Sequence, residues 1–352
     1  MDEALIRSWL DQRTVGHEFS GVALVWVEGA PVFSYAGGLA VRGHGLTVTE
    51  ESRFAVASIT KMATAVAALR LVDRGSISLD SAVVELLPQD QCPQALTPRH
   101  TLAHLLSHTS GLANYHDDED ETWNSFTSCW DRIPTYHVRR PADMLPLFKD
   151  LPGLSDPGET FQYCDTNFIL VGLVLEAATG LTYAEVVATE VFGPAGMPDT
   201  GIEALDDDPP RLATGYMTDS GPYESWRSNV FGVTANGMPD GGMITTATDL
   251  ASFIDAIVGG LLLSPEMTAA MTSPQGPESI EIEQYGFGCE VALENGKVKV
   301  IGHAGSDPGV SAVVSHYVSQ ETTIAVLCNQ DRGSWAVTQH LGQELGLEDP
   351  RS

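Results

Sequence analysis

The pattern of apolar and polar positions changes twice along this chain. Residues 3–15 have the spacing of an amphipathic helix, and residues 21–28 and 32–36 have the pattern of two strands joined by a Gly-Ala-Pro turn. An Ala-rich apolar helix follows, beginning at or near Ser58 and ending at an Arg-Gly pair at 74–75, a typical C-terminal stop. The first 75 residues therefore predict a helix, a β-hairpin and a second helix.

From about residue 76 to residue 240, short helical patterns alternate with loops rich in Pro and Asp. Helices are expected there over 79–87, 101–106 and 167–178, and the charge run 116–121 is expected to be a solvated loop. After residue 240 a helix is expected through about Val258, and strand patterns then return. The predicted strands cover 285–291, 297–301, 310–318 and 322–328, and a closing helix covers 335–345.

This order of elements predicts an α+β fold. An antiparallel β-sheet flanked by helices is expected to be built from both ends of the chain, residues 1–75 and 241–352. A mainly helical domain, residues 76–240, is inserted between them. Any active site is expected in the cleft between the two domains.

Composition and charge exclude several classes of partner. The chain has 47 acidic and 18 basic residues and a net charge of −29, which argues against nucleic acid and anionic membrane surfaces. No apolar run approaches the roughly 20 residues that span a bilayer. The N-terminus has no basic segment followed by an apolar core, which predicts a cytoplasmic protein. Five cysteines without a Cys-x-x-Cys pair are typical of buried thiols and not of a zinc site.

The first candidate for chemistry is the pair Ser58-x-x-Lys61 at the start of the Ala-rich helix. Three residues are close to one helical turn, so both side chains lie on one face. A helix N-terminus offers backbone N–H groups that stabilise an oxyanion, and a desolvated amine accepts a hydroxyl proton. The alternative is a serine that only caps the helix and a solvated lysine. Lysine occurs at four positions only, which modestly favours the chemical interpretation.

Two further short motifs are candidates for the same cleft. Tyr163 precedes the helix expected at Asn167, and a tyrosine there can act as general base and acid if a lysine stabilises its phenolate. The segment Gly302–Ser306 lies on the strand side, where small residues allow a substrate to approach the backbone.

Taken together, the motifs resemble those of the serine β-lactamase-like, penicillin-recognising hydrolases, especially the branch of class C β-lactamases, DD-peptidases and family VIII esterases. The resemblance extends over nearly the whole chain. It rests on FAVASITKM at 54–62, TLAHLLSHTSGL at 101–112, GETFQYCDTN at 158–167 and GHAGSDPG at 302–309. The last motif stands where the family has Lys-Thr-Gly or His-x-Gly. The resemblance implies a β-lactamase/transpeptidase-like fold.

The resemblance also implies roles for individual residues. Ser58 is the nucleophile that forms an acyl-enzyme, and Lys61 and Tyr163 share the work of the general base. The backbone N–H groups of Ser58 and Ser306 form the oxyanion hole. The remaining residues assigned to substrate binding are Asp165, His303, Ala304 and Gly305. No metal and no cofactor are implied.

Departures from the family motifs narrow the substrate. His303 and Ala304 lack the cation and the hydroxyl with which Lys-Thr-Gly holds a substrate carboxylate. Asp165 replaces the commoner Asn, and a carboxylate there pairs either with Lys61 or with a substrate amine. These features favour an intracellular esterase, amidase or transacylase acting on a small acyl substrate. A β-lactamase, a D-Ala-D-Ala carboxypeptidase or a D-aminopeptidase is the alternative within the family.

The sequence leaves three other interpretations open. His100, His104 and His108 follow one another at intervals of four, which suggests a zinc site on one helical face, but the Glu of a His-Glu-x-x-His motif is missing. Ser110 is a second possible nucleophile without a Gly-x-Ser-x-Gly elbow. A non-catalytic ligand-binding protein on the same fold is the main alternative of another class. The natural acyl donor, the acceptor and the oligomeric state do not follow from the sequence.

Overall fold

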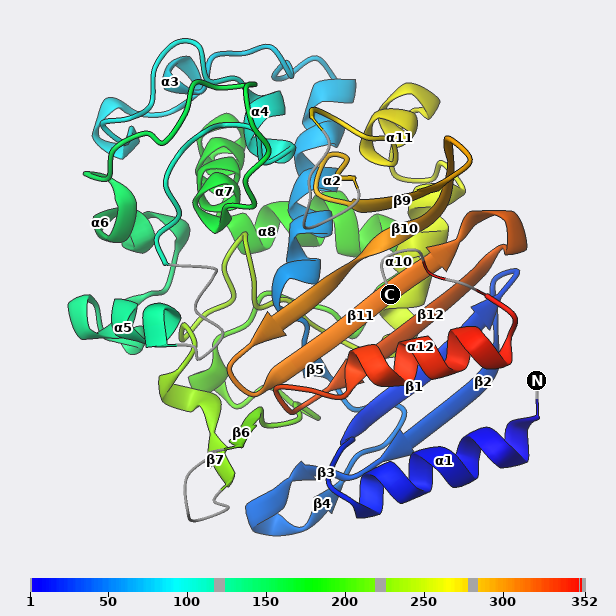
Figure 1. The fold of residues 1–352 in the computed structure, drawn as a ribbon. Coiled ribbons are helices and arrows are strands. Elements are labelled where there is room, and N and C mark those ends of the chain that lie inside the picture. Colours follow the sequence, from blue (N-terminus) through cyan, green and yellow to red (C-terminus); the bar gives the residue numbers. More distant parts are fainter. Residues whose placement is uncertain (1, 117–123, 219–225, 278–283, 348, 350–352) are drawn as a thin grey trace.

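A six-stranded antiparallel sheet runs through the molecule and receives strands from both ends of the chain, in the order β2-β1-β12-β11-β10-β9 (Figure 1). The computed structural model describes residues 2–116, 124–218, 226–277, 284–347 and 349. The sheet strands are β1 (Gly21–Val27), β2 (Ala30–Gly37), β9 (Glu290–Glu294), β10 (Lys297–Asp307), β11 (Val310–Tyr317) and β12 (Thr322–Cys328). Three two-stranded pairs are formed by β3 (Leu39–Val41) with β4 (Leu46–Thr47), β5 (Phe54–Ala55) with β8 (Ile244–Thr245), and β6 (Tyr216–Thr218) with β7 (Trp226–Ser228).

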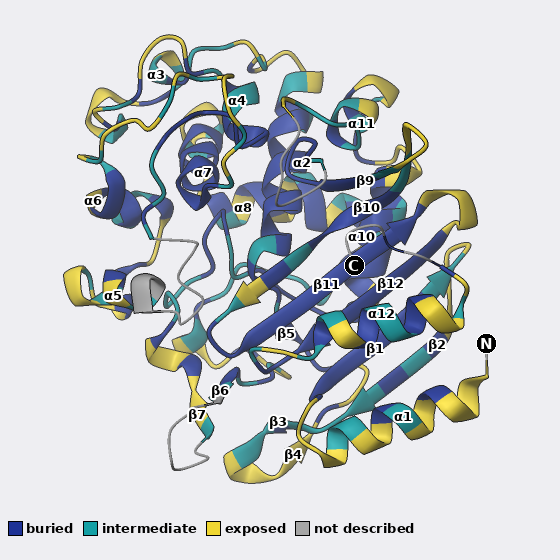
Figure 2. Cartoon of the chain, in the orientation of Figure 1, coloured by how far each residue is buried: buried dark blue, intermediate teal, exposed yellow. Residues whose placement is uncertain are grey.

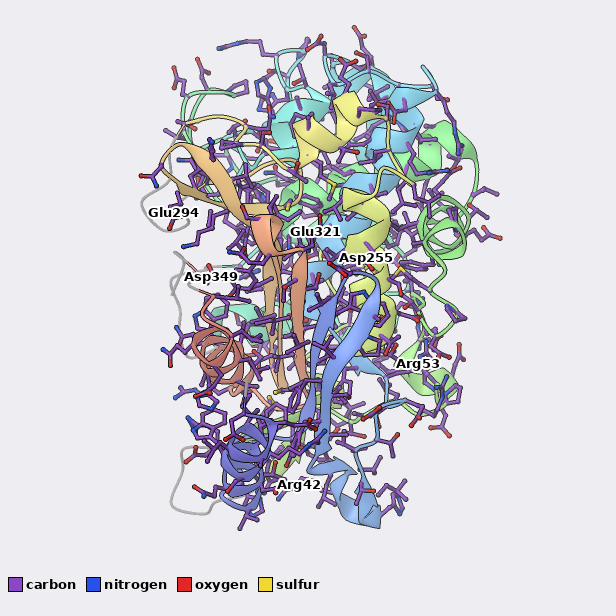
Figure 3. All side chains as sticks on the ribbon, turned by 90° about the vertical axis from the view of Figure 1, so that its right-hand side faces the viewer. Arg42, Arg53, Asp255, Glu294, Glu321 and Asp349 are labelled. Carbon is purple, nitrogen blue, oxygen red and sulfur yellow. The ribbon has the colours of Figure 1, made fainter. Side chains whose placement is uncertain are left out.

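Helices cover both faces of this sheet. The α-helices are α1 (Glu3–Val15), α2 (Thr60–Asp73), α3 (Val83–Leu86), α4 (Leu102–Leu106), α5 (Asn124–Arg132), α6 (Leu145–Phe148), α7 (Asp165–Thr179), α8 (Tyr183–Val187), α9 (Gly193–Ala195), α10 (Ala247–Val258), α11 (Pro265–Met271) and α12 (Ser334–Glu344). In Figure 3, which shows the sheet nearly edge-on, α1 and α12 lie on one side of it and α10 lies on the other.

The side-chain alternation of β1 explains this layering. Ala23 and Val25 pack into one apolar cluster with residues of α1 and α12, whereas Val22 and Leu24 pack into a larger cluster with α2, α7 and α10. A strand buried on both faces reads as a continuous apolar run, as β1 does. The indole N–H of Trp26 donates to Asp255 of α10 (2.6 Å), which joins the sheet to that helix.

The helical half of the molecule is organised around α7. All of its residues from Asp165 to Leu175 are buried, and Figure 2 shows it surrounded by other elements. It packs against α2, α4 and α8, and it ends at Gly180, whose left-handed conformation (φ 71°) terminates the helix. The N-termini of α2 and α7 both line the same cavity beside the sheet.

The fold class expected from the sequence is confirmed: the sheet is antiparallel, both termini contribute to it, and the helical segments lie between. The domain boundaries at residues 75 and 240 stay a prediction. Two expected elements are wrong in extent. The helix expected over 79–87 is limited to α3, and the strand expected over 285–291 begins only at Glu290.

Conversely, β10 is longer than expected and continues through the whole Gly302–Ser306 segment, because β11 pairs with it as far as Asp307. No single helix in the described ranges has both the length and the apolar composition of a membrane span. Within the same ranges, α7 and the following helical segment Tyr183–Ala195 meet both criteria only when taken as a pair, and the pair is bent by 81°.

Candidate active site

Ser58 lies in a short 3-10 turn, Ala57–Ile59, immediately before α2. Ala57 has a positive φ of 45°, an uncommon backbone conformation for a residue with a side chain. The Thr60 hydroxyl donates to the carbonyl of Ala57 (2.6 Å), and the N–H of Val56 donates to the carbonyl of Met243 (3.0 Å). Sequence reasoning placed Ser58 at or near the start of the helix, and the structure places it one short turn before Thr60.

Lys61 is fully buried, and three oxygens lie within 2.8 Å of its Nζ atom. They are Ser58 Oγ (2.8 Å), the carbonyl oxygen of Asp240 (2.7 Å) and Asp165 Oδ1 (2.5 Å). The first two are hydrogen bonds from Nζ, and the third is an ion pair. An ammonium group has three N–H donors and no acceptor, so it matches three surrounding oxygens.

The charges in this cluster favour the ion pair. Burial lowers the pKa of Lys61, but the nearby carboxylates of Asp165 and Asp240 outweigh burial and raise it. Burial likewise acts to raise the pKa of Asp165, but the Lys61 charge and a hydrogen bond from His116 hold it well below its usual range. Lys61 is therefore an ammonium and Asp165 a carboxylate at neutral pH. Pairing with Lys61 is one of the two roles that the sequence left open for Asp165.

Tyr163 faces the same cluster from the segment before α7. Its ring centroid is 5.0 Å from Lys61 Nζ, and its ring lies against the imidazole of His108 with 4.3 Å between centroids. His108 accepts a hydrogen bond from the N–H of Cys164 through Nδ1 (3.1 Å). Burial and the Lys61 charge lower the pKa of His108 well below 6.5, so the ring is neutral and packs behind Tyr163 as an uncharged wall.

The opposite wall is the end of β10. β9 pairs with β10 only up to Gly302, and beyond that point the N–H of Ala304 donates to the Glu290 side chain (3.1 Å). N–H groups two residues apart in a strand point to the same edge, so the N–H of Ser306 points to this edge as well. An added Cβ at Gly305 would lie 3.2 Å from the backbone nitrogen of Ser58. The N–H groups of Ser58 and Ser306 thus belong to adjoining backbone segments, as an oxyanion hole requires.

His303 lines this wall but is bound to protein groups through both nitrogens. Its Nδ1 is 2.5 Å from the carbonyl oxygen of Ala304, which fixes the proton on Nδ1, and Nε2 then accepts from the Tyr285 hydroxyl (3.0 Å). Glu290 Oε1 lies 3.4 Å from Nδ1. Only 1% of the His303 surface is exposed, so this residue shapes the wall and holds Tyr285.

Ser58, Tyr163 and Asp165 line one side of a cavity of about 790 Å³, and His303 to Ser306 line the other. Asp240 and Asp307 also face this cavity. Burial and the charge of Asp165 raise the pKa of Asp240 to about 6, and burial together with Asp240 and Asp165 raises the pKa of Asp307 to about 7. The cavity therefore carries a local excess of acidic groups around one buried lysine.

Sequence reasoning missed four residues of this site. Asp240 offers its carbonyl to Lys61 and its carboxylate to the Tyr115 hydroxyl (2.6 Å), and Nε2 of His116 contacts Asp165 Oδ2 (2.8 Å). The expected solvated loop is thus wrong at His116, while 117–121 lie outside the described residues. The only signal for Asp240 was the Pro-Asp-Gly-Gly turn at 239–242, and Asp307 lay unassigned in the last motif.

The structure does not support the two alternative sites that the sequence disfavoured, a zinc site on three histidines and a nucleophile at Ser110. His100 lies before α4 and His108 after it, so the three histidines do not share a helical face, and His104 caps α4 through Thr101. Within the described ranges, no three potential metal ligands lie together. Ser110 is buried and donates to Asn167 Oδ1 (2.6 Å).

Comparison with known proteins identifies the family of this chain. Residues 6–345 match the family described as Beta-lactamase. Penicillin-binding protein 4* of Bacillus subtilis is 28% identical over 90% of this chain and 69% of its own length. The chain spans 61% to 69% of the length of three curated relatives.

Two solved structures are similar over almost their whole length. A penicillin-binding protein from Bacillus halodurans is 32% identical with a TM-score of 0.88, over 95% of this chain and 99% of that one. A D-stereospecific amidohydrolase from Streptomyces is 26% identical with a TM-score of 0.79, over 99% of this chain and 100% of that one.

Proposed function

Since this chain belongs to the Beta-lactamase family of serine hydrolases, we propose that it acts on small neutral or cationic esters and amides through an acyl-enzyme on Ser58. The observation that carries the proposal is the contact of Ser58 Oγ with Lys61 Nζ (2.8 Å) on the wall of a cavity large enough for a small substrate. A solvated lysine, the alternative weighed above, is inconsistent with the complete burial of Lys61.

The proposed reaction needs one nucleophile, one proton carrier and one oxyanion site. Ser58 Oγ forms a bond to the substrate carbonyl carbon while its proton passes to Tyr163. We take Tyr163 to be a phenolate stabilised by the Lys61 ammonium, which lies 5.0 Å from the centre of its ring. The carbonyl oxygen takes up the negative charge beside the N–H groups of Ser58 and Ser306. When the tetrahedral intermediate collapses, the bond to the leaving group breaks and Tyr163 returns the proton to it. Water or another acceptor then releases the acyl group by the reverse steps.

The acidic lining of the cavity supports the substrate class. Asp240 and Asp307 face the same cavity as Ser58, and the Lys61 ammonium that contacts Ser58 is already paired with Asp165. A substrate carboxylate would therefore meet repulsion, while an amine would be attracted. The likeness to the Streptomyces amidohydrolase supports an amide, and an aminoacyl amide or ester combines both features.

Activity-based labelling tests the proposal directly. A fluorophosphonate probe is expected to label Ser58 of the intact chain, and Ser58→Ala is expected to abolish both labelling and turnover of a p-nitrophenyl short-chain ester. Failure to label folded wild-type protein would contradict the proposed chemistry and favour a non-catalytic binding protein.

A substrate panel then separates the alternatives within the family. Simple p-nitrophenyl esters, D- and L-amino acid amides and a chromogenic cephalosporin are compared by kcat/KM, with released products identified by mass spectrometry. The proposal expects esters and amino acid amides to be the better substrates. A preference for the cephalosporin or for peptides with a free C-terminal carboxylate would contradict the substrate class.

A further inference from the structure

A continuous line of contacts reaches the nucleophile from a residue with no role in the reaction above. His116 Nε2 contacts Asp165 Oδ2 at 2.8 Å, Asp165 Oδ1 contacts Lys61 Nζ at 2.5 Å, and Lys61 Nζ contacts Ser58 Oγ at 2.8 Å. The exposed fractions of the His116, Asp165 and Lys61 side chains are 9%, 11% and 0%. Water therefore has little access to compete for these contacts.

The segment that carries His116 is tied to the start of α7 at more than one point. Asn114 Oδ1 accepts hydrogen bonds from the backbone N–H groups of Asp165 (3.1 Å) and Thr166 (3.4 Å). Tyr115 donates to Asp240 (2.6 Å), whose carbonyl oxygen accepts from Lys61. Three consecutive residues thus contact the groups that surround Lys61, and His116 is the one that contacts the Asp165 carboxylate.

The chemistry of the contact fixes the direction of the hydrogen bond. An ionised carboxylate only accepts, so Nε2 of His116 carries the proton and donates to Oδ2. Each oxygen of the Asp165 carboxylate then contacts a different residue: Oδ2 contacts His116 and Oδ1 contacts Lys61. Rotation of the carboxylate away from Lys61 would break the contact with His116 as well.

Other charged groups near the pair do not duplicate this role. Among the described residues, the titratable groups that interact with Lys61 or Asp165 include His108, Tyr115, Tyr163, Tyr183, Asp240, Tyr285 and Asp307, with His303 beside His108 and Tyr163. Asp240 and Asp307 favour a protonated Lys61 through their charge, but the Asp240 carboxylate accepts from Tyr115, and among the described residues the hydrogen bond to Asp165 Oδ2 comes from His116. We therefore assign the orientation of the Asp165 carboxylate to His116.

We propose that His116 is a positioning residue of the acylation site, which holds the Asp165 carboxylate against Lys61 so that Lys61 remains the hydrogen-bond donor to Ser58 Oγ. With Lys61 as donor, the Ser58 hydroxyl keeps its own proton for transfer to Tyr163. His116 acts through Asp165 and does not contact the reacting atoms. The inference rests on the proposed function, because it concerns the same nucleophile.

A double-mutant cycle tests the inference on the full chain. His116→Leu is expected to lower kcat for a p-nitrophenyl ester at least tenfold with KM changed less than twofold. His116→Gln, which retains an N–H donor at similar reach, is expected to keep kcat within threefold of wild type. In the Asp165→Asn background, where there is no carboxylate to hold, His116→Leu is expected to change kcat less than twofold.

Controls separate positioning from folding. His104→Leu removes another partly buried imidazole, which contacts Thr101 at the start of α4, and it is expected to leave kcat unchanged. If His116→Leu does not fold, His116→Asn, which is too short to reach Asp165, takes its place in the cycle. Equal losses from His116→Leu with and without Asp165, or no loss at all, would overturn the inference. Absence of labelling and turnover in the wild type would instead contradict the proposed function.

Discussion

Gly305 of β10 packs directly on Val56, the residue at which the chain enters the Ser58 turn. An added Cβ at position 305 would lie 2.1 Å from the carbonyl oxygen of Val56 and 3.2 Å from the nitrogen of Ser58. The absence of a side chain therefore brings the two backbone segments of the proposed oxyanion hole together. The contact is between main-chain atoms, which do not rotate away as a side chain does.

Substitution of Gly305 by Ala is expected to abolish acylation. The methyl group would push β10 away from the Ser58 turn and separate the N–H groups of Ser58 and Ser306, and loss of one oxyanion donor typically costs about 100-fold or more in kcat. The rate of fluorophosphonate labelling measures the effect. Gly43→Ala is the control, because nothing lies within 4 Å of a Cβ at that position. Labelling of Gly305→Ala at the wild-type rate would contradict the assignment of this wall.

Replacement of Lys61 by Met is expected to remove activity and stability together. The change leaves the buried carboxylates of Asp165 and Asp240 without their cation, and breaking a buried ion pair costs about 3–5 kcal/mol. The double variant Lys61→Met/Asp165→Asn removes one of those charges, so it is expected to regain much of the free energy of unfolding in urea but none of the activity. A double variant as unstable as Lys61→Met alone would show that Asp165 does not depend on Lys61 for its charge.

The sequence predicted the architecture well because most elements carry their own signals. The apolar runs of β11, β12 and α7 and the stop at Gly180 are local features, and these elements appear within a few residues of their expected places. The segment 285–289 is different. It has the composition of a strand, but Gly288 approaches α2 so closely that a Cβ there would be 2.4 Å from Ala65 Cβ. A tertiary contact overrides the local preference there.

The site was predictable only where a residue belongs to a motif. Ser58, Lys61 and Tyr163 stand in recognisable motifs, and the structure brings them together, with Ser58 and Tyr163 on the wall of one cavity. His116 was assigned to a solvated loop because the residues after it are acidic, and its partner Asp165 lies 49 positions away. Asp240 contributes a main-chain oxygen to Lys61 across 179 positions, a role that does not depend on its side chain. Such contacts are properties of the folded chain.

Asp307 makes stability depend on pH in a definite direction. Its pKa rises from 3.8 to about 7 on folding, so between these values the folded state keeps a proton that the unfolded state releases. Stability is therefore lost as pH rises from about 4 to about 7. Asp307→Asn removes this loss, and it is expected to be more stable than wild type above pH 7, by up to about 4 kcal/mol.

Urea unfolding at pH 5, 6, 7 and 8 checks this expectation. The difference between Asp307→Asn and wild type is expected to grow up to about pH 7 and then to level off. Asp80→Asn, at an exposed position, is the control and is expected to track the wild type at every pH. A difference that is constant from pH 5 to pH 8 would show that Asp307 is already ionised at the lowest pH.

The acidic cavity is expected to rank substrates by charge. Glycine p-nitroanilide carries a free amine, its N-acetyl derivative is neutral and its N-succinyl derivative carries a carboxylate. Because Asp240 and Asp307 face the cavity, kcat/KM is expected to fall in that order, and the spread between the first and the last is expected to shrink when salt is raised from 0.05 to 0.5 M. The double variant Asp240→Asn/Asp307→Asn is expected to compress the series at low salt. A succinylated substrate as good as the amine would contradict a role of these carboxylates in selection, and it would direct attention to Arg332, which also lines the cavity.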